Sequence, residues 1–321
     1  MSQDIFVVVE HQRGSIDDVS FELLGKGRAL AGDTGGALVA VLLGSDTATK
    51  ASALGAADRV VAVDDQGLED FNPEAWLAAL EAVLEAHSPR LTLMAYTSTG
   101  MDLSSALSIR CGLPLVSYAN DVAIEDGAVV VTSQMYGGKI LAESVLEGES
   151  GLVSVLAGSW PADAGRKEGA PPIDSIAAPA SISDPQVRFV SLIEPEGGDV
   201  DITQHDVLVS VGRGIQSKDN IELVEGLAKA MGGAVSASRP IIDNKWLPKT
   251  RQVGKSGLKV KARVYLALGI SGAPEHIEGM KDSELIIAIN TDETAPIFEY
   301  AHYGVTEDLL DIVPLLTERL S

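Results

Sequence analysis

Short apolar runs alternate with stretches of helical spacing over the first 111 residues of the chain. The apolar runs have the length and aliphatic composition of buried parallel strands, and they fall at residues 5–9, 37–43, 60–63 and 91–95. Apolar positions three and four apart predict helices at residues 19–31, 47–57, 73–87 and 101–111. This repetition predicts an α/β fold with a doubly wound, mostly parallel sheet.

The pattern changes after Pro114. Four strands with short turns between them are predicted at residues 115–121, 128–134, 138–144 and 151–157, as an antiparallel addition to the sheet. Residues 160–180 are rich in Pro, Ala and Gly and have no periodicity, which predicts a linker or a long surface loop. A further short strand is predicted at residues 187–193.

A second array of strands and helices begins near residue 206. Strands are predicted at residues 206–211, 265–270 and 285–290, and helices at residues 220–231 and 306–320. We therefore expect two domains, an N-terminal α/β domain over residues 1–199 and a C-terminal α/β domain over residues 200–321. Flexible linkage is expected at residues 160–180 and near Gly197 and Gly198.

The composition agrees with an α/β protein and narrows the range of partners. Hydrophobic residues make up 45% of the chain and aromatic residues 4%, as expected where helices cover strands of small aliphatic residues. The formal charge of −22 argues against nucleic acid and against anionic membrane surfaces. No apolar run approaches the roughly 20 residues of a membrane span, and the single cysteine, Cys111, excludes an internal disulfide. We therefore expect a cytoplasmic protein.

Residues 239–263 carry eight Lys or Arg residues and one acid, Asp243, on a protein that is otherwise strongly acidic. Prolines and glycines within this segment predict a loop. The run VYLALGISGAPEHIEGM follows, and it predicts a buried strand, a turn of small residues and a helix that begins near Pro274. A basic loop beside a helix N-terminus suits a bound anion. The segment therefore predicts an anionic cofactor, with a solvated loop as the alternative.

Two glycine-containing segments match no standard nucleotide motif. Gly212, Arg213 and Gly214 end a predicted strand, at the edge where open α/β sheets bind ligands. Their spacing is not GxGxxG, and an ordinary turn with a surface arginine is the alternative. The segment GKSG lacks the upstream glycine of a P-loop, and residues 258–262 after it predict a strand where a P-loop requires a helix, which excludes a nucleoside triphosphatase.

Single polar residues near the ends of predicted strands are further candidates. Ser271 and the adjacent amides suit a phosphate, and Asn290 suits a ribose or an adenine. His276 lies in the first turn of a predicted helix, where a neutral or protonated imidazole would stabilise a developing anion, although a lone histidine is more often structural. No set of His, Cys, Asp and Glu has the spacing of a metal site, and no GxSxG segment indicates a hydrolase.

Seven short motifs follow one another in the C-terminal part of the chain. They are GRGxxS at 212–217, SR at 238–239, QVGxSG at 252–257, GISGAxxHxxGM at 269–280, AIN at 288–290, API at 295–297 and YG at 303–304. In this order they resemble the FAD domain of the electron transfer flavoprotein alpha subunit, over about the last 115 residues. The first 200 residues are compatible with the same family through their α/β pattern and the YGGK segment at 136–139.

The resemblance implies a heterodimer in which the alpha subunit holds FAD and an electron transfer flavoprotein beta subunit carries AMP or a second FAD. The contacts that it implies for the phosphates and the adenosine are Arg213, Gly269, Ile270, Ser271, Gly272, Ala273, Asn290 and His302. The contacts that it implies for the isoalloxazine ring are Ser238, Arg239, Gln252, Val253, Gly254, Lys255, Ser256, Gly257 and His276. Within this set, the Ser256 hydroxyl is expected at N5 of the flavin and His276 at O2.

Two positions depart from the pattern of the family. Lys255 stands where many relatives have Gln, which implies an altered flavin potential. His302 stands where many have Asp in an ADYG segment, so the contact with the ribose is expected to differ. The arginine beside the ring favours negatively charged, reduced forms of the flavin.

The resemblance implies an electron carrier more than an enzyme that converts a substrate. Such a carrier passes electrons from dehydrogenases, such as acyl-CoA dehydrogenases, to a quinone reductase or another acceptor. A close variant is a subunit of an electron-bifurcating complex that oxidises NADH. The alternatives from other classes are a flavin-free α/β enzyme that binds a pyridine nucleotide, and a regulatory module that binds a ligand through its N-terminal domain.

Overall fold

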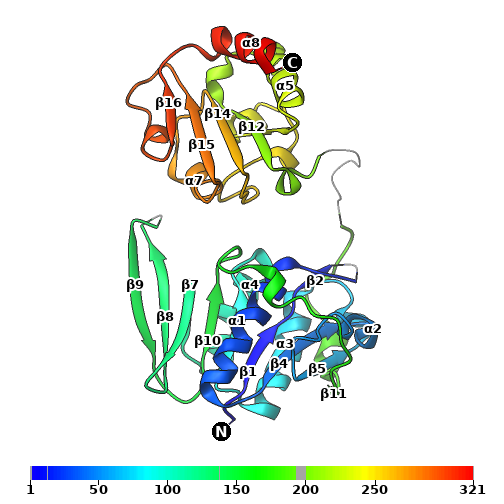
Figure 1. Ribbon diagram of the computed structural model, residues 1–321. Coiled ribbons are helices and arrows are strands. Elements are labelled where there is room, and N and C mark those ends of the chain that lie inside the picture. Colours follow the sequence, from blue (N-terminus) through cyan, green and yellow to red (C-terminus); the bar gives the residue numbers. More distant parts are fainter. Residues whose placement is uncertain (1, 13, 137, 193–199, 321) are drawn as a thin grey trace. The chain divides into compact units, whose positions relative to one another are not determined.

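The computed structural model describes residues 2–12, 14–136, 138–192 and 200–320. The chain forms two compact units, Met1–Ser191 and Leu192–Ser321, and each contains its own sheet (Figure 1). We call them the N-terminal unit and the C-terminal unit. Within the described residues, no helix is both long enough and apolar enough to cross a membrane.

The N-terminal unit contains a nine-stranded sheet in the order β11-β5-β4-β1-β6-β10-β7-β8-β9. Its centre is parallel and consists of β1 (Ile5–Val8), β4 (Leu38–Gly44), β5 (Arg59–Asp64) and β6 (Leu91–Ala95). The helices that alternate with these strands are α1 (Asp18–Thr34), α2 (Thr47–Ala51), α3 (Pro73–His87) and α4 (Ser98–Cys111). Because β1 and β4 are buried on both faces, the unit has two apolar clusters, and the predicted doubly wound sheet is confirmed.

Helix α2 ends at Ala51, so the helix predicted over residues 47–57 is too long. The chain beyond it packs against residues 167–169. The backbone N–H of Gly55 donates to the carbonyl of Lys167 at 2.8 Å, and a Cβ at Gly55 would lie 2.6 Å from the backbone of Glu168. The chain after Ala51 thus pairs with a distant segment and forms no further helical turns.

The sheet continues with an antiparallel meander, as predicted. Its strands are β7 (Leu115–Glu125), β8 (Ala128–Met135) and β9 (Ile140–Leu146). The prediction is wrong for the fourth strand, β10 (Leu152–Val155), which lies between β6 and β7 and runs parallel to both. All four of its residues are buried, so a place inside the sheet suits β10 better than the end of a meander.

Residues 160–180 run over the surface but do not link the two units. They include β11 (Ile173–Ser175), which pairs in parallel with β5 at the edge of the N-terminal sheet, and a short turn, Ala162–Ala164, beside α1. The predicted linker is therefore part of the N-terminal unit. Residues 187–192 form no strand, and their side chains at Val187 and Val190 are exposed. Ile193, Gly197 and Gly198 lie outside the described residues.

The C-terminal unit contains five parallel strands in the order β13-β12-β14-β15-β16. They are β12 (Val207–Val211), β13 (Ala234–Ala237), β14 (Val264–Leu268), β15 (Leu285–Ile289) and β16 (Tyr303–Val305). Helices α5 (Ile221–Ala230) and α8 (Leu309–Leu320) pack together on one face (Figure 1). The strand predicted at residues 258–262 is reduced to one isolated bridge between Leu258 and Val253.

Glu10 has a buried carboxyl group at the carboxyl edge of the N-terminal sheet, two residues after β1. The hydroxyl of Thr97, the residue before α4, donates to Oε1 and Oε2 of Glu10, at 2.8 Å to each. The short strands β2 (His11–Gln12) and β3 (Ser15–Ile16) follow Glu10 in the chain. Burial raises the pKa of Glu10 from 4.5 to about 7, and the hydrogen bond from Thr97 opposes this only in part.

The raised pKa makes the stability of the N-terminal unit depend on pH. A carboxyl group whose pKa rises on folding binds more protons in the folded state, so the unfolding free energy falls as the pH rises from 4.5 to about 7. The substitution Glu10→Gln removes the charge and keeps an acceptor for Thr97. We expect Glu10→Gln to be more stable than the natural chain near pH 8, by up to about 3 kcal/mol, and no more stable near pH 4.5. Calorimetry at both pH values measures this, and a difference that is independent of pH would contradict it.

Candidate cofactor site

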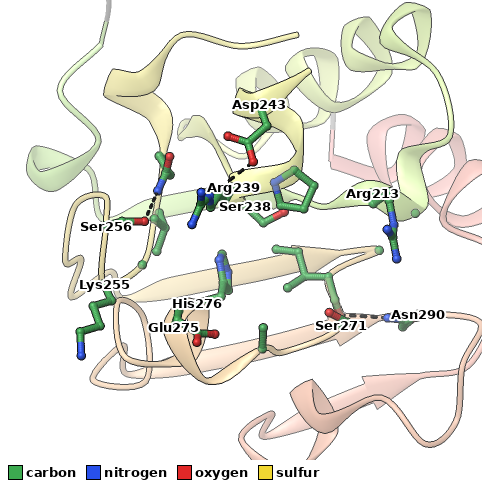
Figure 2. Close-up of a pocket in the computed structure, with 18 of the residues that line it drawn as sticks. Arg213, Ser238, Arg239, Asp243, Lys255, Ser256, Ser271, Glu275, His276 and Asn290 are labelled. Carbon is green, nitrogen blue, oxygen red and sulfur yellow. Dashed lines mark hydrogen bonds and ion pairs between the residues drawn. The ribbon is translucent and has the colours of Figure 1, made fainter. Parts of the chain in front are cut away.

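A pocket of about 750 Å³ lies at the carboxyl edge of the C-terminal sheet (Figure 2). Its walls come from the loops that follow β12, β13, β14 and β15, and ligands of open parallel sheets bind at this edge. The volume is within the range of pockets that bind a small molecule or a cofactor. All the predicted site residues line it except Gly257, Gly272 and His302.

The base of the pocket is a contact between two backbone segments without side chains. The N–H of Gly214, after β12, donates to the carbonyl of Gly269, after β14, at 3.0 Å. A Cβ on Gly214 would lie 2.6 Å from Cα of Gly269, and Gly269 has a φ of +61°. Glycine is therefore required at both positions, since the turn at Gly269 is left-handed and the two chains touch.

Three cations and three acids line the pocket. The cations Arg213, Arg239 and Lys255 were expected from the sequence, whereas the acids Asp243, Glu275 and Asp292 were not expected to line a site. Arg239 Nε lies 3.4 Å from Asp243 Oδ2, and the two side chains are 71% and 63% exposed (Figure 2). The pocket is therefore less positive than the basic segment suggested. The spacing of four residues on the short helix α6 (Arg239–Asp243) is the signal that could have revealed this pair.

The loop that begins at Gln252 presents polar groups to the pocket. Gln252 Nε2 donates to Ser256 Oγ at 2.9 Å, which leaves the hydroxyl hydrogen of Ser256 available for an acceptor in the pocket (Figure 2). Gly254, with a φ of +135°, turns the loop, and a Cβ there would lie 2.7 Å from the carbonyl oxygen of Glu275. The N–H of Lys255 donates to the same carbonyl at 2.7 Å, so the loop is fixed against the segment that carries His276.

His276 lies on the wall opposite Arg239, and Figure 2 shows the two side chains pointing toward the same space. It is 6% exposed, and its Nε2 lies 2.9 Å from the hydroxyl of Tyr265, a buried residue of β14. Burial lowers the pKa of His276 to about 4, and the backbone of Val253 opposes this only in part. Of the two states considered from the sequence, the imidazole is therefore neutral near pH 7.

The helix after Gly269 is shorter than the sequence suggested. Helix α7 (Pro274–Ile277) has four residues, so its dipole is too small to bind an anion by itself. Asn290, after β15, uses its side chain to join two loops. Its Nδ2 donates to the carbonyl of Ile270 at 2.9 Å, and its Oδ1 accepts from the N–H of Asp292 at 3.0 Å. Attraction of an anion therefore depends on the arginines and on the amides of the turn after Gly269.

Both parts of the chain match known protein families. The family model for the electron transfer flavoprotein domain matches residues 5–181, and the model for the electron transfer flavoprotein FAD-binding domain matches residues 201–281. The electron transfer flavoprotein subunit alpha of Syntrophomonas wolfei is 35% identical over 317 residues, which cover 98% of this chain and 98% of the relative. The corresponding protein of Bacillus subtilis is 32% identical over 321 residues, 99% of this chain and 98% of the relative.

This chain belongs to the electron transfer flavoprotein alpha subunit family. A third relative, named acryloyl-CoA reductase electron transfer subunit beta, from Anaerotignum propionicum, is 34% identical over 351 residues, 99% of this chain and 95% of the relative. FAD is the cofactor of the family, and the matched FAD-binding segment supplies the loops after β12, β13 and β14. Three cations around the pocket suit the diphosphate and a negatively charged ring.

In this electron transfer flavoprotein subunit, three predicted contacts lie outside the pocket lining. A Cβ at Gly257 would lie 2.4 Å from the carbonyl oxygen of Gln252, and one at Gly272 would lie 2.3 Å from the backbone nitrogen of Ile297. His302 Nδ1 accepts from the N–H of Ile286 at 3.0 Å, so this side chain extends the pairing between β15 and β16. The lining residues that the sequence did not single out as site residues are Pro240, Asp243, Glu275 and Asp292.

Within the part of the chain that the structure describes, no three or more His, Cys, Asp or Glu side chains are grouped in a way that suits a metal ion. Cys111 is partly buried at the end of α4 in the N-terminal unit, and burial is the main cause that raises the pKa of its thiol.

The two glycines at the base of the pocket lead to a prediction about stability. We expect Gly214→Ala to destabilise the C-terminal unit by about 1–3 kcal/mol, because the added methyl group must displace the backbone of Gly269. Gly226→Ala is the matched control, since Gly226 lies inside α5 and nothing lies within 4 Å of the position of its Cβ. This control should stabilise the unit by about 0.5–1 kcal/mol. Calorimetry of both variants measures the two effects, and a Gly214→Ala variant as stable as the natural chain would contradict the close contact.

Proposed function

We propose that this chain is the FAD-binding subunit of a heterodimeric electron carrier, which passes electrons between dehydrogenases and a quinone reductase or another acceptor. The observation that carries the proposal is the pocket at the carboxyl edge of the C-terminal sheet, with a cation and a neutral imidazole on opposite walls. Bound FAD supplies reversible electron transfer, and the residues of the chain bind the cofactor and set its potential. A cytoplasmic location is part of the proposal.

In this proposal, the two ends of the pocket bind different parts of FAD. Arg213 and the turn after Gly269 hold the diphosphate, because a guanidinium and backbone amides are strong donors to phosphate oxygens. Asn290 lies beside the adenosine. The loop that begins at Gln252 lies beside the ring, with the free hydroxyl hydrogen of Ser256 directed at the flavin and Arg239 next to it.

Arg239 and Asp243 set the charge beside the ring. The guanidinium stabilises negative charge on a reduced flavin, and the carboxylate of Asp243 partly cancels this effect. Both side chains are exposed in this chain alone, so water weakens the interaction of each with a flavin. A partner that covers this side of the pocket would strengthen it. The partner is a beta subunit, and we propose that it carries AMP or a second FAD.

The relatives suggest which enzymes exchange electrons with the carrier. One relative is named for acryloyl-CoA reductase, an enzyme of acyl-CoA thioesters, so we propose dehydrogenases of the acyl-CoA class as donors or acceptors. That relative is named as an electron transfer subunit of a reductase, so we propose as a second candidate a subunit of an electron-bifurcating complex that oxidises NADH. The number of flavins per heterodimer separates the two, because a simple carrier with AMP in its partner holds one FAD and a bifurcating complex holds more.

Co-expression with the beta subunit tests the proposal. We expect a 1:1 heterodimer that is yellow as purified, and a chain that retains FAD poorly when it is expressed alone. Size-exclusion chromatography and a flavin count after denaturation measure both properties. A heterodimer that stays colourless after incubation with FAD would overturn the proposal in favour of a flavin-free enzyme, and an FAD-loaded monomer that transfers electrons would overturn the need for a partner.

Opposite substitutions at the charge pair test the roles of its members. We expect Arg239→Ala to lower the flavin reduction potential, and Asp243→Asn to raise it. Each shift should be about 1 kcal/mol, or roughly 40 mV for one electron, because the side chains are exposed. Asp311→Asn, on the surface of α8, is the control for a simple change of net charge. Redox titration of the heterodimers measures the potentials, and shifts of the same sign for Arg239→Ala and Asp243→Asn would contradict the assignment.

A further inference from the structure

A short chain of polar groups crosses the apolar interior of the C-terminal unit and ends at the pocket. Tyr265, in β14, is fully buried within a cluster of aliphatic side chains. Its hydroxyl lies 2.7 Å from Ser210 Oγ of β12 and 2.9 Å from His276 Nε2 of α7. Ser210 is also fully buried, so Ser210, Tyr265 and His276 form one connected path from the centre of the sheet to the pocket wall.

The hydroxyl of Tyr265 is not needed for packing. A phenylalanine would occupy the same space between the strands, and a buried hydroxyl costs free energy unless it is hydrogen-bonded. Here the hydroxyl has two polar partners, and one of them is a ring that lines the pocket. The benefit of the hydroxyl therefore lies in what it does to His276.

The pairing determines how His276 meets a ligand. Nε2 is engaged with Tyr265, whereas Nδ1 is buried in the wall of the pocket. The phenol has one hydrogen to donate and can accept one, so its arrangement with Ser210 decides which ring nitrogen of His276 carries the hydrogen. A ring that is paired at Nε2 cannot rotate without losing its hydrogen bond to the Tyr265 hydroxyl.

The surroundings of the ring keep it neutral. Tyr265 is the titratable group in contact with it, and burial raises the pKa of this phenol, so it carries no charge near pH 7. The charged groups that line the same pocket are Arg213, Arg239, Asp243, Lys255, Glu275 and Asp292. The low pKa of His276 comes from burial and from none of these charges.

We infer that Tyr265, supported by Ser210, is a positioning residue that holds His276, a residue of the pocket wall, in one orientation and one tautomer. The identity of the cofactor rests on the proposed FAD function, whereas the geometry of the ring is a property of the chain itself. With the ring already ordered, no free energy is lost in orienting it when FAD binds. This assigns a role in the site to two residues that do not line the pocket.

The first test examines the ring without FAD. The full chain, labelled with ¹⁵N in its five histidines, gives the tautomer ratio of His276 by NMR near pH 7, with His276→Gln to assign the signals. We expect one tautomer of His276 to predominate in the natural chain. In Tyr265→Phe, the ratio of this tautomer to the other should fall about tenfold, because one ordinary hydrogen bond is lost. Tyr300→Phe, at a partly exposed tyrosine of the same unit, should leave the ratio unchanged. An unchanged ratio in Tyr265→Phe would overturn the inference.

The second test uses FAD affinity in the heterodimer. We expect Tyr265→Phe to weaken binding about tenfold, Ser210→Ala to weaken it less, and the double variant Tyr265→Phe with His276→Gln to bind no worse than His276→Gln alone. If the losses of FAD affinity caused by the two substitutions are additive, the inference is overturned, because Tyr265 then acts independently of His276. If the natural heterodimer binds no FAD but the tautomer ratio changes as expected, the proposed function fails and the positioning of the ring stands.

Discussion

The contact between the loops after β12 and β14 is the constraint on which the cofactor site depends. Gly214 and Gly269 let two backbones touch at the carboxyl edge of the sheet, where any larger side chain would separate them. The contact fixes Arg213 on one side and the turn that begins at Gly269 on the other. The connection from β13 to β14, which includes the loop that begins at Gln252, then closes over this base through backbone hydrogen bonds from Val253 and Lys255. Four loops of different length thus form one pocket because the backbones of two of them are in direct contact.

The sequence predicts the strands and helices whose own residues are enough to specify them. The central strands of both units are continuous aliphatic runs, and α3 begins after an asparagine cap at a proline, so their positions follow from local pattern. The elements that sequence reasoning missed depend on distant partners. β13 is four small residues, β11 needs the free edge of β5, and β10 is parallel because it inserts between β6 and β7. Such pairings are not encoded within the segment itself.

The same distinction holds for the cofactor site. The basic residues, the glycine turns and His276 could be singled out because their types and order are unusual for this chain. The environment of each residue could not be predicted from the sequence. The partner of His276 is Tyr265 of β14, 11 positions earlier in the chain, and Tyr265 in turn contacts Ser210 of β12. The pairing of Arg239 with Asp243 changes the charge of the pocket. His302 was expected at the cofactor because of its place in a motif, but its side chain accepts a hydrogen bond from the backbone of the neighbouring strand β15.

The two units have the same kind of sheet and use its carboxyl edge in different ways. In the C-terminal unit the edge is hollow, and glycines keep side chains out of it. In the N-terminal unit, Glu10 lies at the point where the chain reverses its direction of winding between β1 and β6, and Thr97 at the start of α4 binds its carboxylate. An acidic side chain of the protein thus lies where an open α/β sheet would otherwise receive an anionic ligand. The carboxyl edge of the sheet is thus filled by a side chain of the protein in one unit and left open as a pocket in the other.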